Sequence, residues 1–203
     1  MNESEDTDNP SVKALIVFRE NGDTDNLFVP ILCDAIRMAG IDVRCSTKDF
    51  WESDTTYDII HFQWPEEAVG RTCNDPDIIR LLEERIRFFR SGGARFVYTR
   101  HNLLPHNANE IIRQAYDIIE SQSDIIVHMG RFSRDEFLAK HPDSHNAIIP
   151  HHIYQYTYKE DISVERARQY LNLSQEAFIV TAFGKFRNRE EIRMVLGAFR
   201  TWD

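Results

Sequence analysis

The chain has 203 residues, of which 33 are acidic and 24 are basic, so its formal net charge is −9 at pH 7. This acidic balance disfavours a general nucleic-acid-binding protein, which needs a basic surface. The sequence contains no run of the ~18 apolar residues that would identify a membrane-spanning helix. Four acidic side chains and no basic one occur in the first ten residues. This is unlike a secretory signal, and we expect a disordered leader over residues 1–10.

Three cysteines are present, Cys33, Cys45 and Cys73, and they form no C-x-x-C pair. Their odd number and their spacing disfavour a disulfide framework or a zinc site. We interpret each one as a small buried apolar residue. A reducing, cytoplasmic location fits this use of cysteine.

From residue 12 onwards, apolar runs of strand length alternate with segments of helical periodicity. The predicted strands are Val12–Phe18, Ile41–Cys45, Tyr57–Phe62, Ala94–Thr99, Asp124–His128 and Ala147–Pro150. The predicted helices are Leu27–Ala39 with Asn26 as its cap, one from Asp75-Pro76 to Ser91-Gly92-Gly93, Asn109–Gln122 and Arg131–Lys140. This alternation predicts a doubly wound, mostly parallel, Rossmann-like α/β domain over residues 11–160, with helices on both faces of the sheet.

The pattern changes after residue 160. Ser163–Leu173 is a predicted helix with Ser163 as its cap, Ala177–Gly184 is a predicted strand and Arg189–Phe199 is a second predicted helix. One strand and one helix cannot close a core, so residues 161–203 are interpreted as a linker helix and a β-α stub that opens another α/β domain. On this interpretation the chain is either truncated or uses its first domain to cover the stub. The uncovered edge of the Ala177–Gly184 strand predicts self-association.

The histidines are concentrated at the ends of predicted strands. Six of the eight lie there, namely His61, His101, His106, His128, His151 and His152. Random placement would put roughly one there, and the carboxyl ends of parallel strands form the edge where ligands bind. No HExxH or GxSxG motif occurs and the first loop has a single glycine, which disfavours zinc, a serine nucleophile and a phosphate cradle. We therefore expect an imidazole rim that hydrogen-bonds hydroxyl-rich ligands and transfers protons near pH 7.

Aromatic residues accompany these histidines at the same predicted strand ends. They are Trp51, Phe62, Trp64, Tyr154, Tyr156 and Tyr158. A flat ring beside polar groups suits a pyranose, which has one apolar face. Ordinary packing in the core is the alternative for each ring.

The segment Arg80–Arg100 has six arginines and two glutamates, a local charge of +4 in an acidic protein. It is interpreted either as a solvated helix face or as a surface that docks to a charged acceptor or to anionic lipid head groups, the latter giving a peripheral membrane contact.

Several segments, in the same order along the chain, resemble those of GT-B glycosyltransferases, most strongly the retaining enzymes of family four. They are His61–Glu66, Thr99–His106, Ser123–His128, Ile149–Tyr154, Ala167–Leu173 and Phe183–Arg187. The resemblance implies an N-terminal acceptor domain and the start of a C-terminal domain for a nucleotide-sugar donor, with no metal or other cofactor. The implied reaction transfers a sugar to a saccharide or lipid-linked acceptor, and this chain alone would be inactive.

The resemblance also implies roles for single residues. His101 is the implied catalytic residue. The implied acceptor or sugar site is made by His61, Trp64, Asn102, His106, His128 and His151. Lys185 and Arg187 are the implied contacts of the donor diphosphate, where charge-assisted bonds favour a cation.

Two alternatives remain at this point. Glu190 and Glu191 stand where the family usually has a cation and a glycine, which favours a domain that binds a sugar or a partner without catalysis. A sugar-nucleotide epimerase is the second alternative, because such enzymes share the GT-B fold.

Overall fold

The computed structural model describes residues 12–20, 27–104, 108–154, 162–184, 186 and 188–200, and the leader predicted over residues 1–10 lies outside them. The chain divides into two units, Met1–His152 and Ile153–Asp203. The boundary thus falls before residue 153, whereas the sequence predicted it at residue 160.

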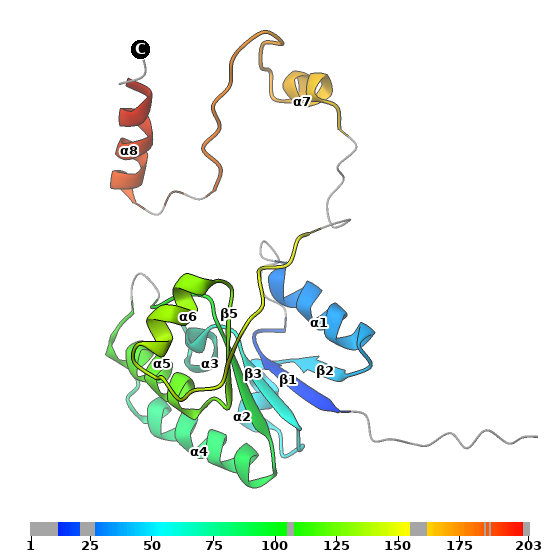
Figure 1. The fold of residues 1–203 in the computed structure, drawn as a ribbon, viewed down its shortest axis with the longest axis vertical. Helices are drawn as coiled ribbons and strands as arrows, with labels where there is room; N and C mark the ends of the chain where they lie inside the picture. Colours follow the sequence, from blue (N-terminus) through cyan, green and yellow to red (C-terminus); the bar gives the residue numbers. More distant parts are fainter. Residues whose placement is uncertain are drawn as a thin grey trace, which may run out of the picture. The chain divides into compact units, whose positions relative to one another are not determined.

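The first unit is built on one sheet of six parallel strands (Figure 1). They are β1 (Lys13–Val17), β2 (Asp42–Cys45), β3 (Ile59–Phe62), β4 (Arg95–Arg100), β5 (Ile125–His128) and β6 (Asn146–Ile148). Their order across the sheet is β2-β1-β3-β4-β5-β6, and every neighbouring pair is parallel. The predicted Rossmann-like α/β fold is confirmed, and each of the six predicted strands is present.

Helices connect these strands: α1 (Phe28–Met38), α2 (Thr47–Glu52), α3 (Pro65–Val69), α4 (Asp77–Ser91), α5 (Glu110–Gln122) and α6 (Arg131–Leu138). The four longer ones match the predicted helices. The cap expected of Asn26 lies outside the described residues, whereas Asn109 does cap α5, because its side chain accepts a hydrogen bond from the Ile112 amide at 2.9 Å. None of the described helices combines the length and the apolar character that crossing a bilayer requires.

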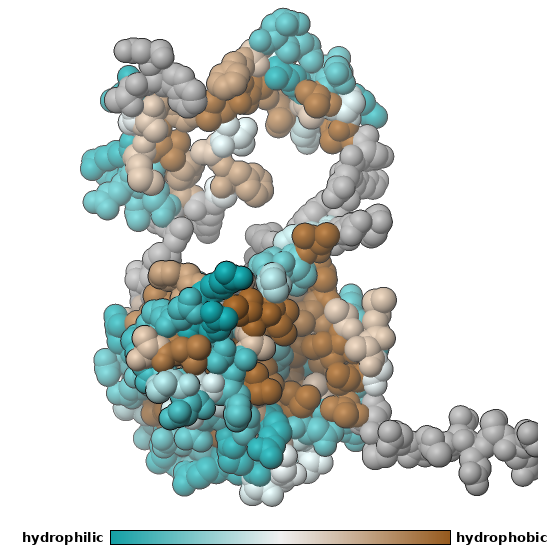
Figure 2. All heavy atoms as spheres, in the orientation of Figure 1, coloured by the Kyte–Doolittle hydropathy of each residue, from teal (hydrophilic) through white to brown (hydrophobic). Residues whose placement is uncertain are grey.

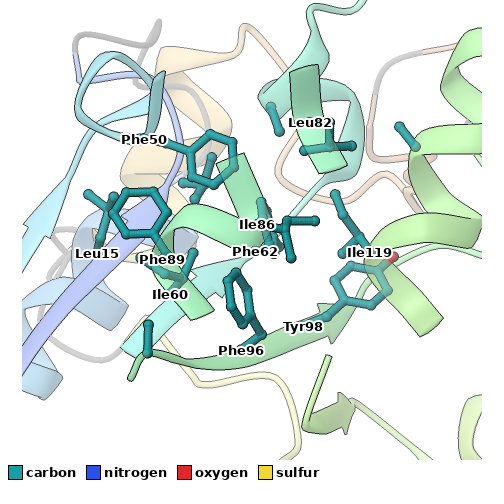
Figure 3. Close-up of a cluster of buried hydrophobic side chains, with 14 of the residues drawn as sticks. Leu15, Phe50, Ile60, Phe62, Leu82, Ile86, Phe89, Phe96, Tyr98 and Ile119 are labelled. Carbon is teal, nitrogen blue, oxygen red and sulfur yellow. The ribbon is translucent and has the colours of Figure 1, made fainter. Parts of the chain in front are cut away.

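The core lies on both faces of the sheet, as predicted. On one face, side chains from α2 to α6 pack with the strands in the larger cluster, part of which Figure 3 shows around Phe62, Phe96 and Ile86. On the other face, α1 alone supplies helical residues, with Phe28, Val29 and Cys33 packed on β1 and β2.

The order of the strands creates a crevice at one edge of the sheet. The chain passes from β1 through α1 to β2 on one side, and then crosses back to β3 on the other side of β1. Connections leave β1 and β3 in opposite directions, so their carboxyl ends flank a gap that no crossover covers. Phe18 follows β1 there and Gln63 follows β3.

The second unit contains two described helices, α7 (Val164–Tyr170) and α8 (Arg189–Arg200). Ser163 caps α7 as predicted, accepting from the Arg166 amide at 3.3 Å. The strand predicted over Ala177–Gly184 is wrong. These residues have no ladder partner among the described residues, and an apolar run without a neighbouring strand leaves its backbone groups unpaired. No described residue of this unit is buried, and Figure 2 shows apolar side chains on its surface.

Candidate functional site

A cavity of about 470 Å³ opens beside the crevice at the carboxyl ends of β1, β3 and β4. Its wall combines residues that follow these strands with residues of α1, among them Phe18, Trp64, Asn102, Cys33, Arg37 and Arg71. This is the edge at which open α/β sheets bind ligands. Its mixed apolar and charged lining suits a ligand with both apolar and polar surfaces.

Next to this cavity, a buried amide connects two of the predicted histidines. Gln63 is fully buried, and its amide nitrogen donates to His61 Nε2 at 2.9 Å. Its amide oxygen accepts from His101 Nε2 at 2.9 Å. Thr99 Oγ1 lies 2.8 Å from the same nitrogen of His61. A histidine of β3 and a histidine that follows β4 are therefore held in one hydrogen-bonded chain.

This chain of hydrogen bonds determines where each imidazole carries its proton. Nε2 of His61 accepts from the Gln63 amide, so the proton of the neutral ring is on Nδ1 and the Thr99 hydroxyl is a second donor. Nε2 of His101 donates to Gln63, so Nδ1 of His101 carries the lone pair. His101 can therefore accept a hydrogen bond from a hydroxyl group through Nδ1.

Aromatic rings fix the plane of His101. The Trp64 ring stacks on it with centroids 4.0 Å apart and an interplanar angle of 16°. The Phe28 ring meets it edge-on at 4.8 Å. Phe28 also contacts His151 at 5.0 Å and stacks on His152 at 4.5 Å, which brings the histidines after β6 to the same place. Three strand ends and the first turn of α1 thus build one aromatic and imidazole cluster.

The predicted titration of this rim near pH 7 is wrong for its two central rings. Burial lowers the pKa of His61 to about 4. Burial, together with the nearby His61 and His151, lowers the pKa of His101 to about 3. Removing an imidazolium from water is costly, so both rings are neutral at pH 7. At this pH the two rings can therefore form hydrogen bonds as neutral groups, but they do not exchange protons with solvent.

Several charged groups of the cavity wall have partners within the chain. Glu67 pairs with Arg71 at 2.5 Å and with Arg19 at 3.8 Å. The buried Glu66 accepts a hydrogen bond from the Tyr116 hydroxyl at 2.8 Å. Burial and the Glu66 carboxylate raise the pKa of Tyr116, so it keeps its proton and remains a donor. The Glu66–Tyr116 hydrogen bond joins α3 to α5, and the Glu67–Arg19 pair joins α3 to the segment after β1.

Most of the predicted sugar-site residues are brought together, and His128 is not. His61, Trp64, His101 and His151 belong to the cluster described above, and Asn102 lines the adjoining cavity. His128 instead lies fully buried on the opposite face of the sheet, where its Nδ1 is 3.0 Å from Ser133 Oγ and its ring packs on Phe137. His106, Lys185 and Arg187 lie outside the described residues.

Three residues of the cluster were not singled out from the sequence: Gln63, Thr99 and Phe28. Gln63 and Thr99 each lie two residues from a predicted histidine, at the same end of the sheet, so the sequence contained a signal that could have identified them. Phe28 carried none, because it begins a helix and its role depends on where α1 crosses the sheet. It packs among residues of β1 and β2 in the second core cluster.

Two of the predicted sugar-binding rings belong to the core instead. Phe62 is 1% exposed and lies in the larger cluster. Trp51 packs against that cluster and donates from Nε1 to the carbonyl of Ala68 at 2.8 Å. Tyr156 and Tyr158 lie outside the described residues.

The six arginines of Arg80–Arg100 each make a hydrogen bond within the chain. Arg80 bonds Glu84, Arg87 bonds the carbonyl of Glu83, and Arg85 bonds the carbonyls of Phe50 and Ser53. Arg90 and Arg95 both reach Asp124, and Arg100 lies buried between Glu120 and Glu136. The local positive charge is therefore largely used in ion pairs and helix packing.

Within the described ranges, no group of three or more His, Cys, Asp or Glu side chains is arranged to hold a metal ion.

Neither a protein-family model nor a curated protein matches the sequence. Two solved structures of a fructokinase from Xylella fastidiosa, one of them with bound ATP, are similar at 15% and 13% identity, with a TM-score of 0.28 in each case. The alignments cover 66% of this chain and 50% and 48% of the two fructokinase chains, so the chain spans about half their length. A likeness of this size carries no argument about activity.

Proposed function

We propose that this chain contains the acceptor-side part of a glycosyltransferase that uses a nucleotide-sugar donor, with a saccharide or a lipid-linked glycan as acceptor. The observation that supports this most is the neutral His101, whose ring lies between Trp64 and Phe28 beside the cavity. A sugar ring offers an apolar face to an aromatic side chain and hydroxyl groups to a hydrogen-bond acceptor. The cluster supplies both, at the edge of the sheet where such folds bind ligands.

In this proposal each residue of the cluster has a definite task. His101 accepts a hydroxyl hydrogen bond of the bound sugar through Nδ1, and Gln63 keeps the proton of His101 on Nε2. His61 orients Gln63 from the other end. The low pKa of His101 keeps its ring uncharged, so its Nδ1 lone pair stays available at pH 7. Preorganised groups of this kind lower a barrier because they need no rearrangement during the reaction.

A binding experiment on the whole chain tests the sugar site. Saturation-transfer NMR with a panel of free saccharides and nucleotide sugars is expected to show contact for at least one sugar, and His101→Ala is expected to abolish it. His145→Ala is the matched control, because His145 lines a different cavity, near the amino ends of β4 and β5. Equal contact in both variants, or no contact with any sugar in the unmodified chain, would remove this site from the proposal.

Turnover gives the second test, in a protein that carries a complete donor domain. His101→Ala is expected to lower the rate of transfer at least about tenfold, equivalent to about 1.4 kcal/mol of barrier. Unchanged turnover would exclude His101 from the reaction. The expected product is a glycoside, whereas an epimerised free nucleotide sugar would favour the epimerase alternative.

A sugar-binding domain without catalysis is the second candidate, and one observation favours it. Glu190 and Glu191 both lie in the first turn of α8. Carboxylates there are stabilised by the partial positive charge of the helix N-terminus, and they would repel a diphosphate at the same place. The donor contacts expected of Lys185 and Arg187 would have to overcome this repulsion. Calorimetry with nucleotide sugars discriminates the two, because only the transferase requires binding of a donor.

The cytoplasmic location is part of the same proposal and rests on the three free cysteines. Peripheral membrane contact through Arg80–Arg100 has less support, since these arginines bond within the chain. Cosedimentation with anionic vesicles tests the contact, and light scattering tests the self-association expected from the exposed apolar residues of 177–183.

A further inference from the structure

Two of the three cysteines lie in the wall of the same cavity. Cys33 lies on α1 and is 3% exposed, whereas Cys45 is the last residue of β2 and is partly exposed. Both side chains belong to the same apolar region, since Cys33 is part of the second core cluster and Cys45 packs against that cluster. Both line the same cavity of about 470 Å³. The two cysteines therefore share one cluster and one cavity, and a small molecule that enters the cavity can reach them.

The surroundings give the two sulfur atoms different characters. The Cys45 thiol and the charge of Arg37 lower the pKa of Cys33, against the opposing effects of burial and Asp34. The pKa of Cys45 is raised, first through its hydrogen bond with Cys33 and then through burial. The Cys45 S–H group donates to the Phe18 carbonyl, with sulfur and oxygen 3.8 Å apart. Cys33 is thus the group that ionises first, and Cys45 keeps its proton.

We propose that Cys33 and Cys45 form a redox modification site, at which a hydroperoxide converts the two thiols into a disulfide. The Cys33 thiolate attacks one oxygen of the peroxide, an S–O bond forms, the O–O bond breaks, and the departing oxygen leaves as water or an alcohol after taking a proton. Cys33 is then a sulfenic acid. The Cys45 sulfur attacks the Cys33 sulfur, the S–S bond forms, the S–O bond breaks, and the hydroxide leaves as water with the proton of Cys45. One peroxide is reduced for each disulfide formed.

The position of the pair determines what oxidation would change. A disulfide requires sulfur atoms ~2.05 Å apart, so the two free thiols must move closer. That movement draws α1 towards the end of β2 and alters the cavity wall beside Arg37. A dithiol reductant reverses it, because exchange with a disulfide restores both thiols. The inference does not depend on the proposed function, since it concerns these two thiols alone.

Cys73 supplies an internal control. It does not line this cavity, and its sulfur contacts only the Asp75 carbonyl, at 3.9 Å, among the contacts given for the described residues. A reagent that oxidised thiols according to exposure alone would not select Cys33 and Cys45 over Cys73. Selective pairing of the first two therefore distinguishes the proposed site from general oxidation.

The experiment is peptide mapping of the whole chain after a brief treatment with hydrogen peroxide. In the reduced chain, all three cysteines should be alkylated. After peroxide it should alkylate at Cys73 alone, with a cross-linked peptide joining Cys33 to Cys45 that disappears on treatment with dithiothreitol. Three alkylated thiols after peroxide, a disulfide that includes Cys73, or a bond between two chains would overturn the proposal.

Single variants test the order of the two steps. In C45S the reaction should stop at a sulfenic acid on Cys33, which dimedone labels, whereas C33S should give neither the label nor the disulfide. C73S should behave as the unmodified chain does. Dimedone labelling at Cys45 in C33S, equal to that at Cys33 in C45S, would contradict the assignment of Cys33 as the attacking group. The mapping of the unmodified chain stands as the test if a variant does not fold.

Discussion

Replacement of Gln63 by leucine tests whether one buried amide holds the two imidazoles of the cluster in place. The substitution keeps the side chain buried and removes both of its hydrogen bonds, at 2.9 Å each. The His101 Nε2–H group then has no acceptor, and a buried donor without a partner costs about 1–3 kcal/mol. His61 loses less, because the Thr99 hydroxyl still donates to it. We expect the free energy of unfolding to fall by about 2 kcal/mol.

Urea denaturation of the whole chain, followed by circular dichroism, measures this loss. Gln114→Leu is the control, because Gln114 lies exposed on α5 and bonds only Glu110 among the hydrogen bonds described. Its effect should stay within about 0.5 kcal/mol. Equal transition midpoints for the two variants would show that the amide contributes nothing to the packing of the histidines.

A double-mutant cycle then isolates the bond between Gln63 and His101. His101→Phe removes the donor while keeping a ring against Trp64, so in its presence Gln63→Leu no longer strands an N–H group. The second substitution should cost about 1 kcal/mol less in this background than in the unmodified chain. Effects that add within about 0.3–0.5 kcal/mol would refute the hydrogen bond as the source of the coupling.

Three further predictions concern the fold around the site. The pKa of His61 is lowered to about 4 in the folded chain, so between about pH 6.5 and pH 4 the unfolded state binds a proton that the folded state does not, and stability falls as the pH falls. His61→Gln should make the urea midpoint depend less steeply on pH in this range. Parallel profiles for the variant and the unmodified chain would contradict the burial of a neutral His61 ring. Arg100→Met should lower the free energy of unfolding by about 3 kcal/mol, because the Arg100 side chain is only 4% exposed and its loss leaves Glu120 and Glu136 without their buried partner. Arg95→Met is the control. The Arg95 side chain is 75% exposed, so its replacement should cost under about 1 kcal/mol. Asn109→Ala should cost about 1 kcal/mol through loss of the α5 cap, and an unchanged thermal midpoint would refute that role.

The sheet could be predicted because its strands are apolar on both sides. Leu15 and Val17 face the larger cluster while Ile16 faces the smaller one, and all three are at most 1% exposed. Such continuous apolar runs identify strands covered on both faces. The same signal failed over 177–184, where the run is equally apolar. An apolar sequence favours a β-strand, but the strand forms only where a neighbouring strand is available for backbone hydrogen bonds.

The two short helices were not predicted because neither is long enough to show a helical period. α2 has six residues and α3 has five. Their first residues did carry local signals. Ser46 accepts from the Asp49 amide at 2.9 Å, which is the N-cap bond expected of serine, and Pro65 begins α3 at the position where proline is favoured. Helix α3 matters for the site, since it follows Trp64 directly.

The prediction that His128 belongs to the sugar site is wrong for a physical reason, which a count of the histidines at strand ends cannot detect. Successive side chains of a strand point to opposite faces, so two residues share a face only when their registers agree. His61 pairs with Val97, two positions before Thr99 and four before His101, and so these side chains share the face that α1 covers. His128 pairs with Arg100, which has the opposite parity and faces α5 and α6. Register therefore separates His61, on the face that α1 covers, from His128, which packs on Phe137, although both lie near the carboxyl ends of strands that flank β4.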